Sequence, residues 1–363
     1  MKNLKLIGFL MILASSLMFI QCTSDPIMGP QGLAGVDGVN GVDGTDGTNG
    51  VDGTASCVAC HNNLNKEHAE ESYLVSIHAK ETLHTDRGTG DIITTSAYTN
   101  RSGCVQCHTS GGYIDSMNGV ELKGGSGYPS GLAYSGNQAI TCTTCHGTHS
   151  TFDFANDGFD YALRAGIMPV ALDQDPAYAM DMGSSNTCVK CHQPRGLPPT
   201  VGDASGNVKL NGRFGPHHGP QSTLLEGIQG AMYAGSAVYP APKSATHRTG
   251  SSCTSCHMGQ QDEGEHNGLH SWHPSEKACL TCHTNGAPSE VSGYAADMET
   301  LKTLLIAKGA FDGTADAFTS NSVPLKVAQA AWNFALLRED RSNGIHNPGY
   351  AKALLKNSIE AAQ

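Results

Sequence analysis

Six copies of the pentapeptide Cys-x-x-Cys-His are spaced along this chain of 363 residues. The two thiols of such a motif can each bond to a vinyl group of haem, and the adjoining histidine is then placed to bind the iron. The cysteines are Cys57 and Cys60, Cys104 and Cys107, Cys142 and Cys145, Cys188 and Cys191, Cys253 and Cys256, and Cys279 and Cys282. The histidines are His61, His108, His146, His192, His257 and His283. The motifs predict six covalently attached haem c groups, each with a proximal histidine.

Other uses of cysteine explain the pattern less well. The motifs take twelve of the thirteen cysteines and leave only Cys22, so a disulfide framework would have no cysteines of its own. A zinc site would not explain why a histidine follows the second cysteine every time. We therefore interpret all six motifs as haem attachment sites.

The sixth ligand of each iron decides between an electron carrier and an enzyme, because an iron with two protein ligands has no open position for a substrate. Of the seventeen histidines, eleven lie outside the motifs, and six of these would saturate all six irons. They are His68, His78, His84, His149, His217, His218, His247, His266, His270, His273 and His346. This excess favours bis-histidine iron over methionine ligation, which would raise the reduction potential.

The elements that position these residues should be short helices at the motifs, joined by long glycine-rich loops. The chain has 44 glycines and only 6% aromatic residues, which is little apolar side chain for a conventional large core. We expect haem to supply the packing instead. The predicted class is therefore mainly α with extensive coil, in a haem-packed multihaem cytochrome c fold.

Longer helices should follow the last motif. Apolar residues at helical spacing predict one helix within 290–309 and a second from Ser322 or Pro324 to about Arg338. Asn347 is a suitable N-cap for a third, with Pro348 at its first position, running to about Ala361. We expect a haem-binding region at 55–287, and C-terminal helices at 288–363 that pack on it. His346 directly precedes the third helix.

The N-terminus has the pattern of an export signal at residues 1–21: Lys2 and Lys5 precede an apolar run from Leu6 to Ile20. Its end resembles a lipoprotein signal, in which Cys22 would become the lipid-modified N-terminus. An uncleaved anchor helix, or ordinary cleavage that leaves Cys22 as a spare thiol, are the alternatives. Each version exports the protein, to the periplasm or the outer cell surface.

Residues 22–54 should form a spacer. Glycine recurs at every third position from Gly29 to Gly53, which is the collagen period, but Pro30 is the only proline among the triplets. This favours a flexible linker over a trimeric stalk, so a homotrimer is the lesser alternative. The formal net charge of −11, without a basic patch, argues against nucleic acid and suits redox partner proteins with a cationic face.

Several passages resemble the multihaem cytochrome c superfamily that includes tetrahaem electron carriers of ammonia oxidisers, pentahaem nitrite reductases and octahaem relatives. The resemblance runs from about Cys57 to Ser358. It rests on Ser72-Tyr-Leu-Val-Ser-Ile-His78, Cys142-Thr-Thr-Cys-His-Gly-Thr-His149, Gly215-Pro-His217-His218-Gly-Pro-Gln221, His247 shortly before Cys253, Leu269-His270-Ser-Trp272 and Asp340-Arg-Ser-Asn-Gly-Ile-His346. It implies distal ligands at His78, His149, one of His217 or His218, His247, His270 and His346.

The sequence departs from that superfamily in two ways. No motif ends in lysine, as the active haem motif of the nitrite reductases does, and the count of six differs from four, five or eight. Spacing does not tell which distal histidine serves which iron.

We therefore predict an exported, lipid-anchored hexahaem cytochrome that relays single electrons and is not an enzyme. The alternative is a reductase of small nitrogen or sulfur oxyanions with one open iron and a nearby proton donor. The donors considered are His68, His84, His273, Tyr73 and Tyr113. A structural haem filament or surface stalk is the third possibility.

Overall fold

A computed structural model describes residues 55–79, 84–85, 92–93, 102–120, 140–149, 161–166 and 168–363. The chain divides into two units, Met1–Ala55 and Ser56–Gln363, and the second is the one considered below. The predicted signal segment, Cys22 and the glycine-rich spacer lie outside the described residues. Within the described part of the chain, no helix is both long enough and apolar enough to cross a membrane.

A short helix lies at every attachment motif, as the sequence predicts. In these turns the amide of the motif histidine bonds to the carbonyl of the first cysteine, for example His61 to Cys57 at 2.8 Å and His192 to Cys188 at 2.9 Å. This spacing puts the first cysteine and the histidine on one face of the turn. The motif helices are α2 (Ala55–Cys60), α4 (Ser102–His108), α6 (Cys142–Cys145), α7 (Asn186–Val189), α10 (Cys253–His257) and α11 (Glu276–Leu280).

Further helical segments lie between the motifs. The longest is α3 (Asn63–Val75), whose N-cap Asn62 accepts a hydrogen bond from the amide of Asn65. The chain leaves α3 in extended conformation at Ser76 and so reaches His78 two residues later. The others are α5 (Ser110–Met117), η2 (Gly183–Ser185), α8 (Gln221–Glu226), α9 (Thr246–Gly250) and η3 (Leu269–Ser271).

The strands of the described residues form four antiparallel pairs, which the sequence analysis did not predict. They are β1 (His84–Thr85) with β2 (Ile92–Ile93), β3 (Val170–Leu172) with β4 (Asp175–Met180), β5 (Asn207–Lys209) with β8 (Ser322–Pro324), and β6 (Phe311–Asp312) with β7 (Ala317–Phe318). The pair β5–β8 ties the segment after the fourth motif to the C-terminus, with Val208 opposite Val323. Among the described residues, many more lie in helices than in strands, in agreement with the predicted class.

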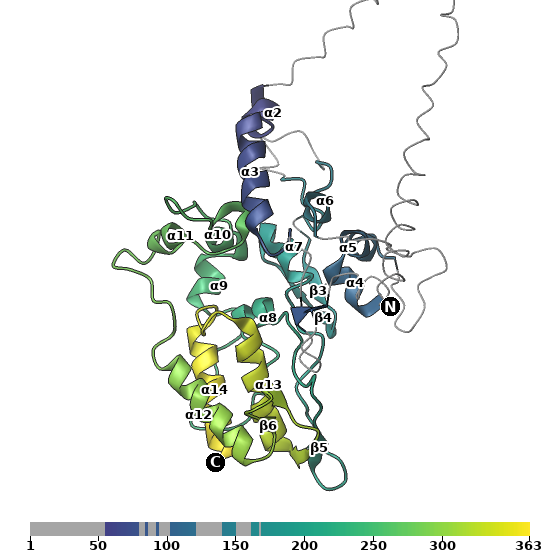
Figure 1. Ribbon diagram of the computed structural model, residues 1–363, viewed down its shortest axis with the longest axis vertical. Coiled ribbons are helices and arrows are strands. Elements are labelled where there is room, and N and C mark those ends of the chain that lie inside the picture. The colour runs from purple at the N-terminus through teal and green to yellow at the C-terminus, as the bar shows by residue number, and fades with distance from the viewer. Residues whose placement is uncertain are drawn as a thin grey trace, which may run out of the picture. The chain divides into compact units, whose positions relative to one another are not determined.

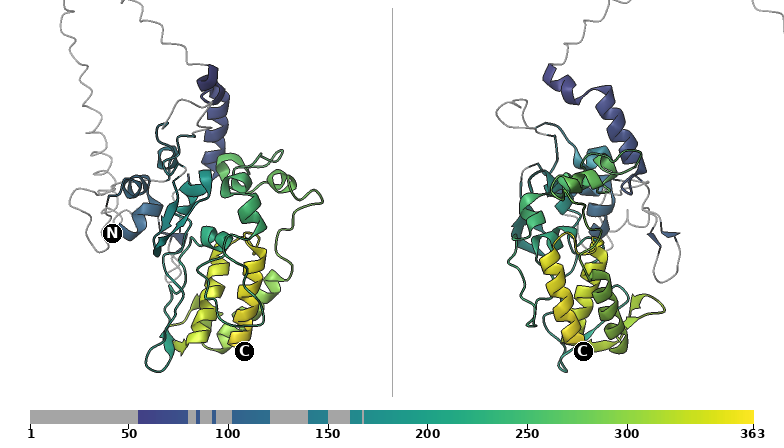
Figure 2. Two further views of the ribbon diagram at one scale, coloured as in Figure 1. Left: turned by 180° about the vertical axis from the view of Figure 1, so that it is seen from behind. Right: turned by 90° about the vertical axis from the view of Figure 1, so that its left-hand side faces the viewer.

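Three longer helices follow the last motif: α12 (Tyr294–Ala307), α13 (Leu325–Asp340) and α14 (Pro348–Ala362). The predicted positions of all three are confirmed. The predicted cap of the third is also confirmed, since the Asn347 side chain accepts a hydrogen bond from the amide of Tyr350 at 3.1 Å. The three helices lie side by side in both Figures 1 and 2. We call them the C-terminal helical region, and residues 55–283 the haem-motif region.

A conventional apolar core lies under the C-terminal helical region. It includes fully buried side chains such as Leu301, Leu336 and Leu354, and two leucines from the haem-motif region, Leu210 and Leu224. The expectation that the chain has too little apolar side chain for such a core was therefore wrong for this part of the molecule. Small residues explain the difference, because the many alanines of α13 and α14 let the helices approach closely.

The haem-motif region has a second, much smaller apolar cluster. It comprises Val170, Leu172, Met180, Met182, Val189 and Leu225. These residues join the β3–β4 pair to α7 and α8, next to the fourth attachment motif. The described part of the haem-motif region thus has little apolar packing of its own, as the composition predicts.

Candidate haem sites

Each of the six motif histidines faces one histidine from outside the motifs. The ring centroids are separated by 5.9 Å for His61 and His149, 6.2 Å for His192 and His78, 6.4 Å for His108 and His217, 6.2 Å for His146 and His270, 6.0 Å for His283 and His247, and 6.2 Å for His257 and His346. The distances are nearly uniform although the partners come from very different places in the sequence.

This separation fits a metal ion held between two imidazoles. A metal–imidazole bond is about 2 Å long and the binding nitrogen lies ~1 Å from the ring centre, so two opposed ligands have centroids about 6 Å apart. Imidazoles in direct hydrogen-bond contact would lie closer than this. The residues of all six pairs therefore fit a haem iron with two axial histidines.

The pairs differ in the angle between the two ring planes. The planes are close to perpendicular in the pairs of His61, His108 and His192, at 82°, 79° and 75°. They are less inclined in the pairs of His146 and His257, at 43° and 40°, and the pair of His283 lies between at 63°. Because axial ligand orientation affects the electronic structure of haem iron, the sites are not equivalent.

The histidines from outside the motifs do not face the motif that is nearest to them in sequence. His78 follows the first motif but faces His192 of the fourth, while His149 follows the third motif and faces His61 of the first. His346 comes from beyond all six motifs and faces His257 of the fifth. The three-dimensional fold, and not sequence proximity, determines the pairing.

The remaining histidines outside the motifs have other surroundings. His217 faces the motif histidine His108, whereas His218 bonds through Nδ1 to the carboxylate of Glu339 at 2.8 Å. His217 has a left-handed backbone conformation, with φ 70°, and the two adjacent imidazole rings have centroids 4.6 Å apart. His68, His266 and His273 are exposed. His84 lies in β1, and its side chain is outside the described residues.

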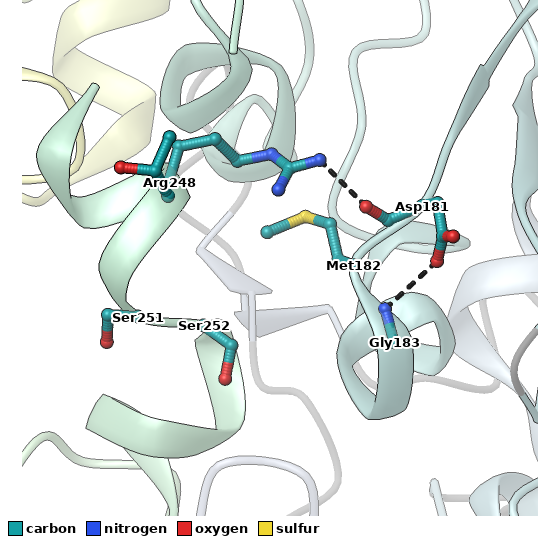
Figure 3. Close-up of a pocket in the computed structure, with 7 residues that line it drawn as sticks. Asp181, Met182, Gly183, Arg248, Ser251 and Ser252 are labelled. Atoms are coloured by element: carbon teal, nitrogen blue, oxygen red, sulfur yellow. Dashed lines mark hydrogen bonds between the residues drawn. The ribbon is translucent and has the colours of Figure 1, made fainter. Parts of the chain in front are cut away.

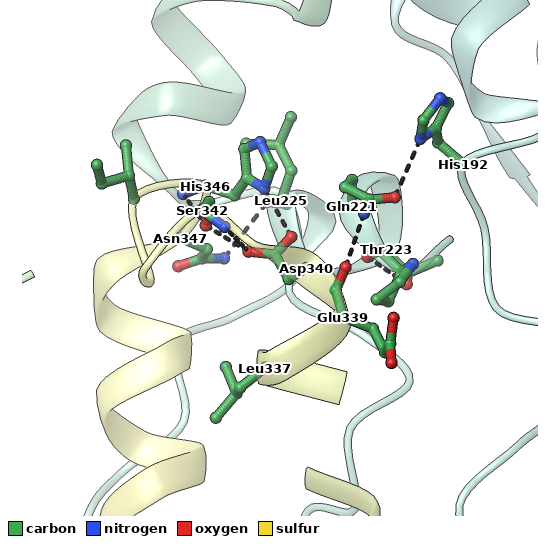
Figure 4. Close-up of polar contacts among 12 residues, drawn as sticks. His192, Gln221, Thr223, Leu225, Leu337, Glu339, Asp340, Ser342, His346 and Asn347 are labelled. Atoms are coloured by element: carbon green, nitrogen blue, oxygen red, sulfur yellow. Dashed lines mark hydrogen bonds and ion pairs between the residues drawn. The ribbon is translucent and has the colours of Figure 1, made fainter. Parts of the chain in front are cut away.

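The C-terminal end of α13 supports His346. Its Nδ1 lies 2.6 Å from a carboxylate oxygen of Asp340, which is fully buried, and Asp340 also accepts a hydrogen bond from the hydroxyl of Ser342 (Figure 4). Burial lowers the pKa of His346, but the Asp340 charge and hydrogen bond outweigh it and raise the pKa above its ordinary value. A carboxylate in this position increases the basicity of the imidazole as a metal ligand. The sequence analysis gave Asp340 no role.

The same helix end supports the fourth motif through Gln221. The Gln221 carbonyl oxygen lies 3.0 Å from Nδ1 of His192, and its amide donates to the main-chain oxygen of Glu339 at 2.9 Å (Figure 4). Glu339 and Asp340 are both nearly fully buried. Carboxylates are rarely buried to this extent unless a partner group binds them. Each of these carboxylates contacts one imidazole, Glu339 that of His218 and Asp340 that of His346.

Main-chain carbonyls hold three further imidazoles. Nδ1 of His146 lies 2.8 Å from the oxygen of Tyr161, Nδ1 of His257 lies 2.8 Å from the oxygen of Trp272, and Nδ1 of His247 contacts the oxygen of Ile345. A carbonyl accepts only, so Nδ1 carries the proton in each case. The Nε2 lone pair of each ring is then available to a metal, and the ring orientation is fixed.

Burial favours the neutral form of several facing histidines. It lowers the pKa of His78 to about 4, with a smaller contribution from the positive charge of His192. It lowers the pKa of His217 to about 3, with further contributions that include His218. Only a neutral imidazole can donate a lone pair to iron, so at neutral pH both rings are in the form that binds a metal.

Attachment cysteines of different motifs lie next to one another. Cys107 lies close enough to Cys191, and Cys188 to Cys253, for each thiol to shift the pKa of the other, which is lowered at Cys107 and Cys253 and raised at Cys191 and Cys188. The twelve motif cysteines, all of which the structure describes, form no disulfide. The fourth motif therefore has the second motif on one side and the fifth on the other.

A polar pocket of about 370 Å³ adjoins the fifth motif (Figure 3). Arg248 lines it, but the guanidinium group is bonded to the buried carboxylate of Glu226 and to the main-chain oxygen of Asp181. Among the described residues, no three acidic, histidine or cysteine side chains are grouped so as to hold a bare metal ion. The geometry of this pocket thus adds no second chemical site to the histidine pairs.

Comparison with known proteins agrees with this arrangement. The family described as outer membrane cytochrome MtrC/MtrF-like, domains II/IV, matches residues 44–200, which include the first four motifs. The polyhaem c-type cytochrome OmcC of Geobacter sulfurreducens is 25% identical over 334 residues, covering 72% of this chain and 43% of OmcC. OmcB of the same species is 23% identical over 333 residues, covering 72% of this chain and 44% of OmcB.

Two solved structures are also similar. The outer cell wall cytochrome OcwA has 20% sequence identity and a TM-score of 0.47, with 80% of this chain and 50% of OcwA covered. An undecahaem cytochrome from the S-layer of Carboxydothermus ferrireducens has 16% identity and a TM-score of 0.41, with 79% and 40% covered.

The chain spans less than half the length of the polyhaem relatives that it matches in sequence. The similarity nonetheless covers 72% of this chain, and the family match includes the first four attachment motifs. The attachment motifs and the similarity to multihaem c-type cytochromes agree, and both support covalently bound haem c.

Proposed function

We propose that this protein is an exported hexahaem cytochrome that relays single electrons through six bis-histidine haems. The observation that carries the proposal is the set of six imidazole pairs, each with ring centroids about 6 Å apart. Haem supplies one-electron chemistry when bound, and the residues of the chain fix the ligands, the mutual positions and the surroundings that set the potentials.

The pairs give a specific ligand assignment. The motif histidine of each site is the proximal ligand, and the distal ligands are, in motif order, His149, His217, His270, His78, His346 and His247. In this assignment His217 is the distal ligand of the second site. His218 is not a ligand and bonds to the carboxylate of Glu339. It leaves no motif without a distal histidine, which favours a relay over a reductase with one open iron.

Contacts between the sites support a continuous path. Neighbouring attachment cysteines bring the fourth site close to the second and to the fifth. The first and third sites share one short segment, since His146 is proximal in one and His149 distal in the other. His247 of the sixth site contacts the oxygen of Ile345, the neighbour of His346 of the fifth. Neighbouring haems would therefore lie within short range for electron transfer.

The two tyrosines considered as proton donors for a reductase are hydrogen-bonded to main-chain oxygens. The Tyr73 hydroxyl donates to the oxygen of Ile140 at 2.6 Å, and the buried Tyr113 hydroxyl donates to the oxygen of Thr187. Burial raises the pKa of both phenols, which makes them weaker acids. His68 and His273 are exposed. The arrangement therefore gives the oxyanion reductase no specific support, and the narrower resemblance to tetrahaem carriers and nitrite reductases stays a prediction.

The proposal includes a place at the cell surface. The matching family is described as outer membrane cytochrome, and the N-terminus of this chain has an export pattern. We propose that residues 1–21 are removed, that Cys22 carries the lipid anchor, and that residues 22–54 are a spacer to the haem region at 55–287. The partners are then redox proteins on either side of the relay. The homotrimer and the structural stalk have no support beyond the glycine period.

The proposal is tested by counting haems and observing their spin state. The mature protein should carry six haems in its intact mass, and electron paramagnetic resonance of the oxidised form should contain low-spin iron only. Carbon monoxide should barely change the reduced spectrum, because no iron has an open position. One high-spin, carbon monoxide-binding haem per chain would instead support the reductase.

A further inference from the structure

Trp272, one of the two tryptophans of the chain, has an unusual backbone conformation. It directly follows η3 and has φ 55° and ψ 15°, a left-handed conformation that is rare for a bulky residue. A small loop holds it there, closed by a hydrogen bond from the amide of Gly268 to the oxygen of His273 at 2.7 Å. Such conformations persist only where the surroundings enforce them, and they concentrate at functional sites.

Two different parts of Trp272 contact axial histidines. Its main-chain oxygen accepts the hydrogen bond from Nδ1 of His257 at 2.8 Å. Its indole ring packs edge-on against His78, with centroids 4.5 Å apart, and against His270, with centroids 5.6 Å apart. In this left-handed conformation the main-chain carbonyl contacts one imidazole and the indole contacts two others.

The three imidazoles belong to three different pairs. His78 faces His192 of the fourth motif, His270 faces His146 of the third, and His257 is itself the histidine of the fifth. No other residue of the described chain has hydrogen-bond or ring contacts with histidines of these three pairs together. Trp272 thus lies where three sites meet.

The end of α3 fixes the other side of the indole. The ring of Tyr73 lies edge-on to Trp272 at 6.2 Å, and the amide of His270 donates to the hydroxyl of Ser72 at 3.2 Å. Ser72 is buried. The helix that leads to His78 is therefore docked on the loop that carries His270 and Trp272, and the indole fills the space between the two imidazoles.

We propose that Trp272 is a positioning residue shared by three haem sites: the indole sets the ring orientations of His78 and His270, and the carbonyl sets that of His257. This rests on the proposed bis-histidine ligation. A ring that packs against an imidazole restricts rotation about its side-chain bonds, and axial ligand orientation is one of the means by which a protein tunes haem iron.

Two substitutions separate the roles of the indole and the carbonyl. Trp272→Gly removes the indole but favours the left-handed backbone, so the carbonyl bond to His257 should remain. Trp272→Val disfavours that backbone and should disturb the carbonyl as well. We expect Trp272→Gly to shift two low-spin resonance signals, those of the third and fourth sites, and Trp272→Val to shift the signal of the fifth site too.

Trp272→Phe keeps an aromatic ring of smaller size, so it should shift the signals of the third and fourth sites by less than Trp272→Gly does and leave the other four signals unchanged. The matched control is Trp332→Phe. Trp332 lies in α13 and donates from Nε1 to the oxygen of Gln229, away from the imidazole pairs. Its substitution should leave all six signals unchanged.

The outcomes distinguish this inference from the proposed function. High-spin iron in the wild-type protein would contradict the proposed function before any variant is made. If the wild-type haems are low-spin and Trp272→Gly carries all six haems with unchanged signals, the indole has no positioning role, while the proposed function stands. If Trp272→Gly does not fold, Trp272→Phe decides: signals that differ at the third and fourth sites only support the proposal, and signals identical to wild type or altered at all sites overturn it.

Discussion

The haem-motif region and the C-terminal helical region are built in different ways. The three helices of the C-terminal helical region have 14, 16 and 15 residues and share one large apolar core. The motif helices have 4 to 7 residues, and the apolar cluster beside the fourth motif contains six buried side chains. Short helices with so little apolar contact are not stable alone. The difference indicates that the C-terminal helical region folds by side-chain packing, and we expect the haem-motif region to need haem for stable folding.

The two regions meet at the end of α13. Glu339 and Asp340 close this helix, and through them the C-terminal core holds His218, His346 and, by way of Gln221, His192. The C-terminal helical region therefore supplies a rigid support for histidines of the proposed fourth and fifth sites.

Withholding haem should have the largest effect. In apoprotein made without export and haem attachment, amides of α7, α10 and α11 should lose hydrogen-exchange protection, because haem replaces the missing core. Amides of α12, α13 and α14 should keep much of theirs. Hydrogen exchange followed by mass spectrometry checks this. Equal protection of α10 in apoprotein and holoprotein would contradict the claim that the two regions differ in their need for haem.

Loss of His346 should change the ligation of a single haem. We expect His346→Ala to retain six covalent haems but to convert one haem, that of His257, to a high-spin form with a raised potential. Resonance spectra and a redox titration measure both changes. His68→Ala and His273→Ala are the controls, since both residues are exposed. A silent His346→Ala would mean that the C-terminal helical region supplies no ligand.

A cavity in the C-terminal core should reduce stability without changing the haems. Leu354 is fully buried in α14, so Leu354→Ala should lower the free energy of unfolding by about 2–5 kcal/mol. Denaturant unfolding followed by circular dichroism measures the loss. Leu64→Ala, at a side chain that is 60% exposed in α3, is the matched control and should change little. Altered haem spectra in Leu354→Ala would show that the two regions are not separable.

The smallest effect should come from Asp340→Asn. This change keeps a hydrogen-bond acceptor near Nδ1 of His346 but removes the charge, so the imidazole becomes a weaker donor to ferric iron. The potential of the fifth site should rise while the site stays low-spin and the other five potentials stay in place. Asp316→Asn, at an exposed aspartate paired with Lys302, is the matched control. An unchanged potential would show that the carboxylate only positions the ring.

Sequence alone predicts the parts that depend on local chemistry. Thioether formation fixes the motif spacing, which locates the attachment residues, and helical periodicity with the Asn347 cap locates the C-terminal helices. The pairing of histidines is not local: His78 and His192 are brought together only by the fold. The choice between His217 and His218 depends on contacts that are distant in sequence, with His108 for the first ring and with Glu339 for the second. Asp340, Gln221 and Trp272 carry no motif, because any acceptor of suitable geometry can support an imidazole.

The surroundings of the fourth motif have a consequence for the robustness of conduction. With haem in all six sites, the fourth site would lie beside three others: the second and fifth, whose attachment cysteines are its neighbours, and the third through Trp272. The first site then extends the arm of the third, and the sixth extends the arm of the fifth. Such a network has three terminals rather than two. Damage to one arm leaves a path between the other two, and damage to the fourth site still leaves the third and fifth sites joined through Trp272.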